Sequence, residues 1–161
     1  MTKGPITSPL SQSAKEATGP VLQGSLVDLI DLALNGKQAH WNVVGSHFLS
    51  VHRQLDELVD TARNFADDVA ERAAAIGVAP SGQAKTVAET SGLPEVPGGW
   101  KQDREVVAII VPILQTLVER MRARIDDVEK ADLVTQDLLL GIACKLEEMH
   151  WMWQAQLADS A

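Results

Sequence analysis

The chain has 161 residues and a mass of 17.4 kDa, which suits one ordinary domain and excludes two large ones. Hydrophobic residues make up 45% and charged residues 22% of the chain, a balance that excludes wholesale disorder. The 14 Lys and Arg residues stand against 22 Asp and Glu residues and give a net charge of −8. That charge disfavours nonspecific nucleic-acid binding, because phosphates are bound by cationic side chains, and it is compatible with attraction of metal cations.

Cys144 is the single cysteine, so no intrachain disulfide can form and we expect a protein of the reducing cytoplasm. The longest apolar run, residues 106–114, contains Pro112 and is far shorter than the roughly 20 residues that a membrane span needs. The N-terminal segment has no continuous apolar stretch of the kind that export signals contain. We therefore expect no membrane partner.

The first residues are rich in Pro, Ser, Thr and Gly, and this composition predicts a flexible N-terminal tail over residues 1–19. The remainder, residues 20–159, is predicted to form one helical domain. A first helix is predicted over residues 21–43, where aliphatic side chains recur at spacings of three and four. A second helix is predicted over residues 46–76, with Gly77 as its end.

Residues 78–99 contain several Gly and Pro breakers, and a short helix over residues 83–90 is the only regular element expected there. Two more long helices are predicted over residues 101–129, with a kink near Pro112, and over residues 135–158. No segment shows sustained strand alternation, and the long middle connection indicates a crossover between two helical hairpins. The predicted fold class is all-α: a four-helix bundle of ferritin-like topology with a short extra helix in the crossover.

Five residues on the first two predicted helices could bind a metal ion. Imidazoles and carboxylates are ligands that iron, zinc and manganese accept, and the candidates are His40, His52, Asp56, Asp67 and Glu71. The last four form two pairs with a spacing of four residues, so the members of each pair share one helix face. With His52 as zero on a helical wheel, all four lie within a stripe about 100° wide.

The two pairs are too far apart to share one ion within a chain. Fifteen residues separate His52 from Asp67, which is about 22 Å along a helix axis, whereas metal–ligand bonds are about 2 Å long. One interpretation is a solvated polar stripe. The other is that two copies of the helix pack antiparallel about a two-fold axis near Thr61 and Ala62, so that each pair faces the partner's other pair. Small residues there, including Ala66, would allow close approach.

His40 lies at the end of the first predicted helix. It is either a histidine that caps the helix C-terminus, where the helix dipole favours it, or a further imidazole ligand near the inter-chain site. His47 is an extra histidine beside these residues and is assigned no role.

The run from Lys37 to Gly45, with Phe48, His52, Asp56 and the segment from Asp67 to Arg72, resembles the ferroxidase signature of the Dps family. These are the mini-ferritins called DNA-binding proteins from starved cells. The residue types and spacings agree over the 36 positions from Lys37 to Arg72. The resemblance implies dimers that assemble into a hollow homododecamer, which oxidises Fe(II), preferably with hydrogen peroxide, and stores the ferric product as a mineral.

The same resemblance implies a role for each candidate ligand. Asp67 and Glu71 of one chain and His40 of the other would bind the first iron at a two-fold interface. His52 and Asp56 would help to hold a second iron or a water molecule beside it, with Glu71 as a bridge. Two Fe(II) ions held beside one peroxide could give up two electrons together, which avoids hydroxyl radical.

Other positions are less directly tied to the site. By the resemblance, Trp41 is a possible electron donor that traps a stray oxidising equivalent, and its alternative role is that of a core aromatic. An iron-entry pore is implied near the start of the last helix, at Glu129, Asp132 and Asp137, where like charge concentrates cations. Asp132 and Asp137 could instead serve the helix N-terminus.

Two rival functions remain. A di-iron or haem site inside one bundle would need two Glu-x-x-His pairs, and the chain has only Glu147 with His150, which we interpret as a surface pair. A DNA-compacting role would need basic tails, but the N-terminal tail has only Lys3 and Lys15, and no Lys or Arg follows Trp153. We therefore expect weak or absent DNA binding, and nucleoid association only if such binding occurs.

Overall fold

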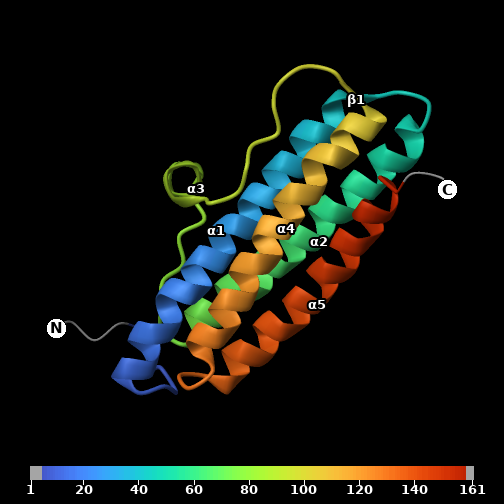
Figure 1. Ribbon diagram of the computed structural model, residues 1–161. Coiled ribbons are helices and arrows are strands. Elements are labelled where there is room, and N and C mark those ends of the chain that lie inside the picture. The colour runs from blue at the N-terminus through green and yellow to red at the C-terminus, as the bar shows by residue number, and fades with distance from the viewer. Residues whose placement is uncertain (1–4, 159–161) are drawn as a thin grey trace.

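Figure 1 shows an elongated bundle of four long helices in the computed structural model, which describes residues 5–158. The long helices are α1 (Gln12–Asn42), α2 (Phe48–Ala75), α4 (Asp103–Val128) and α5 (Leu133–Ala155), and the short elements are α3 (Ala84–Thr90), β1 (Val43–Val44) and β2 (Lys101–Gln102). α1 packs mainly against α2, and α4 against α5. The crossover that carries α3 joins these two hairpins, so the predicted all-α four-helix fold is confirmed.

The core consists mainly of aliphatic side chains on the inner faces of the long helices. Among those with no exposed surface are Leu22, Leu29, Leu55, Leu117 and Leu146. Full burial of such a side chain contributes about 1.5–3 kcal/mol, so the periodic apolar positions decide which faces meet. No helix within the described residues combines the length and the apolar character that a membrane span requires.

The first helix begins at Gln12, which places residues 12–19 in α1 rather than in the predicted tail of residues 1–19. Ser11 caps this end, since its Oγ accepts a hydrogen bond from the Ala14 amide at 3.2 Å. Gly19 is buried against Val78, and a Cβ atom at Gly19 would lie 3.3 Å from that side chain. Packing against the bundle therefore outweighs the Pro, Ser, Thr and Gly composition that predicted a flexible tail. Residues 1–4 lie outside the described part.

α4 runs as one continuous helix through Pro112, near which a kink is expected from the sequence. A proline inside a helix removes one backbone donor. The Pro112 carbonyl accepts a hydrogen bond from the Thr116 hydroxyl at 2.9 Å. Both flanking residues that face the core, Ile110 and Ile113, are fully buried, so packing holds the helix together on either side of the proline.

A two-stranded parallel sheet joins the ends of α1 and of the crossover. β1 pairs with β2 in a register that sets Val43 opposite Lys101 and Val44 opposite Gln102. Sequence patterns miss these strands because two residues are too few to show alternation. The sheet fixes where the crossover ends, directly beside the C-terminus of α1.

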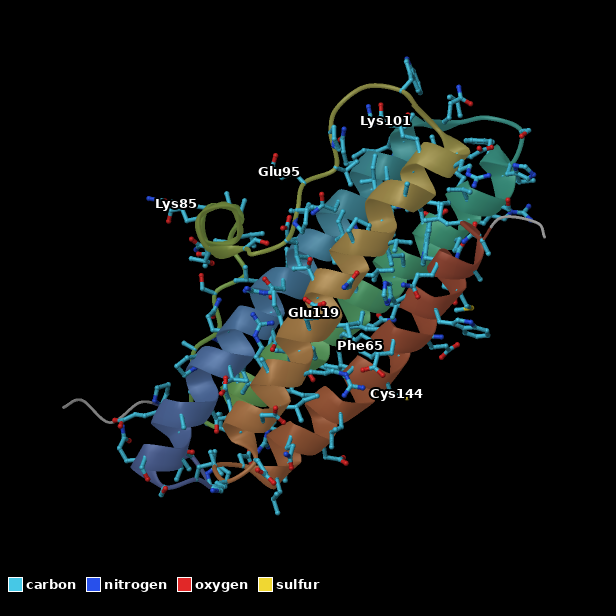
Figure 2. All side chains as sticks on the ribbon, viewed as in Figure 1. Phe65, Lys85, Glu95, Lys101, Glu119 and Cys144 are labelled. Carbon is cyan, nitrogen blue, oxygen red and sulfur yellow. The ribbon has the colours of Figure 1, made fainter. Side chains whose placement is uncertain are left out.

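Several hydrogen bonds tie the crossover to α1. The Val96 amide donates to Asn35 Oδ1 at 2.8 Å, and the Ser91 hydroxyl donates to Asp31. In Figure 2, Lys85 and Glu95 project from this segment away from the bundle. The crossover is thus held by its inner polar contacts while its outer side carries charge.

Asp28 of α1 is a fully buried carboxylate that two guanidinium groups neutralise. Its Oδ2 lies 2.7 Å from Arg120 Nε and 2.7 Å from an Arg124 guanidinium nitrogen. Its Oδ1 also accepts from the Gly92 amide of the crossover at 3.3 Å. One side chain therefore connects α1, α4 and the crossover, and a charge buried in this way persists only when it is paired.

Replacing Asp28 with alanine is expected to lower the free energy of unfolding by about 3 kcal/mol, because two cations then lose their partner. The value lies at the low end for a buried pair since Arg120 is 38% exposed and reaches water. Urea unfolding measures the change. Lys85→Ala, which removes a cation from an exposed pair with Glu89, is the control and should leave the unfolding curve in place. An equal shift in both variants would contradict the assignment.

Candidate metal centre

Three of the five predicted ligands meet where the end of α1 lies against the first turns of α2. Potential ligand atoms of His40, His52 and Asp56 all lie within 4.8 Å of one another. This is the only such group among the described residues. Sequence spacing could pair His52 with Asp56, but the tertiary contact between α1 and α2 is what adds His40.

The two imidazole rings stack on each other. Their centroids are 3.6 Å apart with an interplanar angle of 26°, and the Phe48 ring lies 4.9 Å from His52. His52 Nδ1 lies 3.1 Å from the His40 carbonyl oxygen. Because a carbonyl can only accept, Nδ1 donates and Nε2 of His52 keeps a free lone pair, which is the usual preparation of a histidine ligand.

His40 is nearly enclosed, with its side chain 10% exposed. Its Nε2 lies 3.0 Å from Asp56 Oδ1, within ion-pair distance, yet neither ring nitrogen makes an aligned hydrogen bond within the described part of the chain. Buried polar nitrogens are normally satisfied. A cation held between His40 Nε2 and the Asp56 carboxylate would give this nitrogen a partner. The residues present therefore fit a metal ion.

Asp56 is held in its ionised form by Lys37. The Lys37 ammonium lies 2.5 Å from Asp56 Oδ1, and this hydrogen bond is the main reason that the pKa of Asp56 falls below its usual value. His40 lowers the pKa of Asp56 further. The carboxylate is therefore a charged ligand at neutral pH, and Lys37, to which sequence reasoning could assign no partner, orients it.

Asp67 and Glu71 do not join this group. Both are exposed on α2, and Asp67 follows Asp56 by 11 residues, which is about 16 Å along the helix. Within one chain the candidate centre therefore has three ligands at one end of α2 and two carboxylates further along the same exposed side.

Ala62 and Ala66 have a different role from the one expected. Their relative exposures are 0% and 8%, because they face the core of their own bundle. A second chain could not reach them, so the idea that these small residues permit close approach of a partner helix is wrong. Their size instead serves the packing of α2 within the bundle.

Glu71 borders a groove between α2 and α5 of about 560 Å³, which Asp68, Arg72, Asp137 and Leu138 also line. Asp137 and Glu129 are exposed. Two residues proposed for different tasks, Glu71 and Asp137, therefore share one open groove.

Asp132 is a buried residue at the start of α5. It is 6% exposed, it caps α5 by accepting from the Thr135 amide at 3.2 Å, and it lies 2.5 Å from the Arg72 guanidinium. Burial alone would raise the pKa of Asp132, but hydrogen bonds from Thr135 and Arg72 hold the pKa below its ordinary value. Its carboxylate is engaged by these contacts within the chain, which supports the helix-terminus alternative for this residue.

Trp41 is 65% exposed, which excludes the alternative that it is a core aromatic. It lines a cavity of about 590 Å³ together with His40, His52, Phe48 and Trp100. Trp100 belongs to no sequence motif, and it directly precedes β2, which pairs with β1 at the end of α1.

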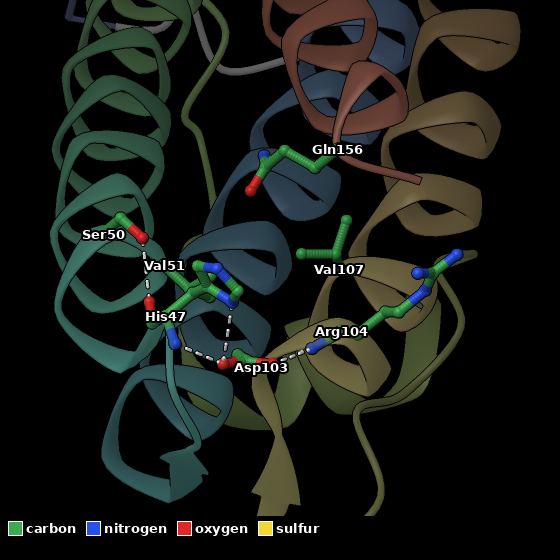
Figure 3. A pocket seen from close by; sticks show the side chains of 7 residues that line it. All are labelled: His47, Ser50, Val51, Asp103, Arg104, Val107 and Gln156. Atoms are coloured by element: carbon green, nitrogen blue, oxygen red, sulfur yellow. Dashed lines mark hydrogen bonds and ion pairs between the residues drawn. The ribbon is translucent and has the colours of Figure 1, made fainter. Parts of the chain in front are cut away.

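A second pocket, shown in Figure 3, lies where α2 and α4 begin and α5 ends. The His47 amide donates to Asp103 Oδ2 at 2.6 Å, and His47 Nδ1 lies 3.6 Å from the same oxygen. Asp103 therefore caps the start of α2 from another helix. His47 is the N-cap residue of α2, and its side chain makes no capping hydrogen bond.

Glu147 of the Glu147 and His150 pair is held by a contact on the protein surface. Glu147 accepts from Arg122 Nε at 2.6 Å, on the surface between α4 and α5. The two residues join no metal-binding group within the described residues.

Comparison with known proteins agrees with this geometry. A family model described as a ferritin-like domain matches residues 21–161. The chain is 37% identical over 139 residues to DNA protection during starvation protein 2 of Deinococcus radiodurans, covering 86% of this chain and 58% of that protein. It is 34% identical over 155 residues to the DNA protection during starvation protein of Mycolicibacterium smegmatis, covering 94% and 82%. The solved structure of Mycobacterium smegmatis Dps in its tetragonal form matches with a TM-score of 0.93 at 32% identity, covering 99% and 96%.

The bundle, its long crossover and the domain match define a ferritin-like helical protein. Within this class the chain belongs to the Dps family, since its match covers 82% of the mycobacterial protein. The chain spans 58% of the length of the Deinococcus protein.

Acid should remove the stability that Asp132 contributes. A carboxyl group whose pKa is lower in the folded state stabilises the fold above its unfolded pKa, and this stabilisation is lost as the pH falls through the folded value. The difference in unfolding free energy between wild type and Asp132→Asn should therefore be full at pH 7 and shrink once the pH falls below the ordinary value of 3.8. Urea titrations over that range measure it. Asp137→Asn, in an exposed position on α5, is the control, and a pH-independent difference for Asp132 would contradict the assignment.

Proposed function

We propose that the protein is a ferroxidase that stores iron. Two chains pack their α2 helices antiparallel, and each of two equivalent sites takes His40, His52 and Asp56 from one chain and Asp67 and Glu71 from the other. Such isologous pairing produces both sites at once. The observation that carries the proposal is the separation within one chain: three ligands within 4.8 Å of one another, and two carboxylates on the same helix out of reach.

The chemistry follows from holding two oxidisable cations beside one peroxide. Two Fe(II) ions reduce one hydrogen peroxide and, with two protons, give two Fe(III) ions and two water molecules. Both electrons leave together, so no hydroxyl radical is released. Asp56 and Glu71 supply negative charge that favours the ferric product, and the imidazoles of His40 and His52 fix the position of the ions.

Storage requires a closed assembly with an entrance for iron. We propose dimers that assemble into a hollow dodecamer in the cytoplasm, with the ferric mineral inside. Glu129 and Asp137 are the candidates for an acidic iron entrance, because exposed carboxylates of like charge concentrate cations. Asp132 is not among them.

Titration of the assembled protein with Fe(II) and hydrogen peroxide tests this function, with ferric absorbance and particle mass recorded together. His52→Ala and Glu71→Ala should each lower the initial oxidation rate by about tenfold or more, since each removes a ligand from every site. Glu57→Gln removes an exposed carboxylate next to Asp56 and should leave the rate unchanged. Wild-type protein that oxidises no iron above the buffer rate would overturn the proposal.

Mixed dimers show whether each site spans two chains. A dimer of one wild-type chain and one chain with both His52→Ala and Glu71→Ala should have no intact site and little activity. A dimer that carries His52→Ala in one chain and Glu71→Ala in the other should keep one intact site and about half the activity, because activity scales with intact sites. If each site took all its ligands from one chain, the first dimer would keep about half the activity and the second would have little.

DNA compaction is the alternative function, and charge argues against it. The chain carries −8, so an assembly of many copies is strongly anionic. Lys15 lies within α1 rather than in a free basic tail. We expect no saturating shift of DNA in a gel at moderate salt, and a shift that survives added salt would show the opposite.

A further inference from the structure

The chain limits where a single electron can come from. It contains no Tyr and four Trp residues, so indoles are its only readily oxidised aromatic side chains. Trp153 is fully buried and Trp151 lies exposed on α5, whereas Trp41 and Trp100 both line the cavity beside His40 and His52. Two of the four indoles, those of Trp41 and Trp100, thus line the cavity beside the candidate metal ligands.

The pairing of β1 with β2 places Trp100 near this cavity. Trp100 directly precedes β2, and the pairing of Val43 with Lys101 sets it beside the C-terminal end of α1, the end that carries Trp41. Cβ atoms built at the two glycines before it, Gly98 and Gly99, would have no neighbour within 4 Å. These two glycines therefore hold Trp100 in place by no side-chain contact of their own.

Trp100 is also not used as a core residue. It is 72% exposed, the largest exposed fraction among the large hydrophobic side chains of the described residues. Leaving an indole in water gives up the stabilisation that its burial would provide. Trp153, with no exposed surface, shows how the same chain uses a tryptophan for packing.

We infer that Trp100 is a second one-electron donor of the iron site, an inference that rests on the proposed function. The case arises when a site holds one Fe(II) and meets hydrogen peroxide. One electron from that ion gives Fe(III), hydroxide and hydroxyl radical. The radical takes a hydrogen atom from the Trp100 indole and becomes water, and the unpaired electron stays on the indole. Overall, Fe(II), hydrogen peroxide and one indole N–H give Fe(III), hydroxide, water and an indolyl radical.

The experiment exposes the assembled protein, loaded with less than one Fe(II) per site, to excess hydrogen peroxide. Peptide mass spectrometry locates oxidised tryptophan, and a spin trap in solution measures escaping hydroxyl radical. We expect iron-dependent oxidation at Trp100 and Trp41, and none at Trp151, which is 66% exposed but outside the cavity and serves as the internal control.

Three variants separate electron donation from a structural role. Trp100→Phe keeps an aromatic ring but is hard to oxidise, so spin-trap signal should rise, while Trp100→Tyr should restore the wild-type signal because phenols are readily oxidised. Trp151→Phe should change nothing. Particle mass, and the oxidation rate at full iron loading, should be the same in all three.

Three results would each overturn the inference. Trp100 could stay unmodified, Trp100 and Trp151 could be oxidised equally, or Trp100→Tyr could give the same spin-trap signal as Trp100→Phe. Failure of the proposed function is distinct, because it would show as absence of iron oxidation in the wild-type protein. Failure of the Trp100 inference alone would leave iron oxidation by the wild-type protein normal.

Discussion

The reach of side chains along a rigid helix is the constraint from which the organisation of this protein follows. α2 holds Asp56 and Asp67 about 16 Å apart, and no rotamer changes that separation because the backbone hydrogen bonds fix the rise per residue. Metal–ligand bonds are about 2 Å long. The ends of α2 can therefore act together only through a second copy of the helix. Assembly and chemistry are coupled in this proposal by geometry.

The neighbouring structure serves to hold one end of α2 in place. α1 delivers His40 to His52, and Lys37 keeps Asp56 ionised. The crossover is anchored to buried Asp28 through the Gly92 amide and ends at the two-stranded sheet, and its Trp100 lines the same cavity. The crossover and the small sheet, which connect the two hairpins, thus also form part of the surroundings of His40 and His52.

Sequence periodicity predicts the four long helices because their apolar spacing is sustained over many turns. It fails at Gln12, where Ser11 and packing of Gly19 overcome a breaker, and at β1 and β2, which are too short for a pattern. The five candidate ligands could be found from type and spacing. The partners of Asp132 and the burial of Ala62 could not, because both depend on which face of a helix meets the core.

The continuity of α2 also makes its length a molecular ruler. One residue inserted between Asp56 and Asp67 would advance the far carboxylates by about 1.5 Å and rotate them by about 100° about the axis. Substitutions on the outer face leave this spacing intact, whereas an insertion or deletion would alter both proposed inter-chain sites of a dimer at once. The exposed positions of this stretch can therefore vary in residue type, whereas its number of residues is fixed by the distance that the carboxylates must span.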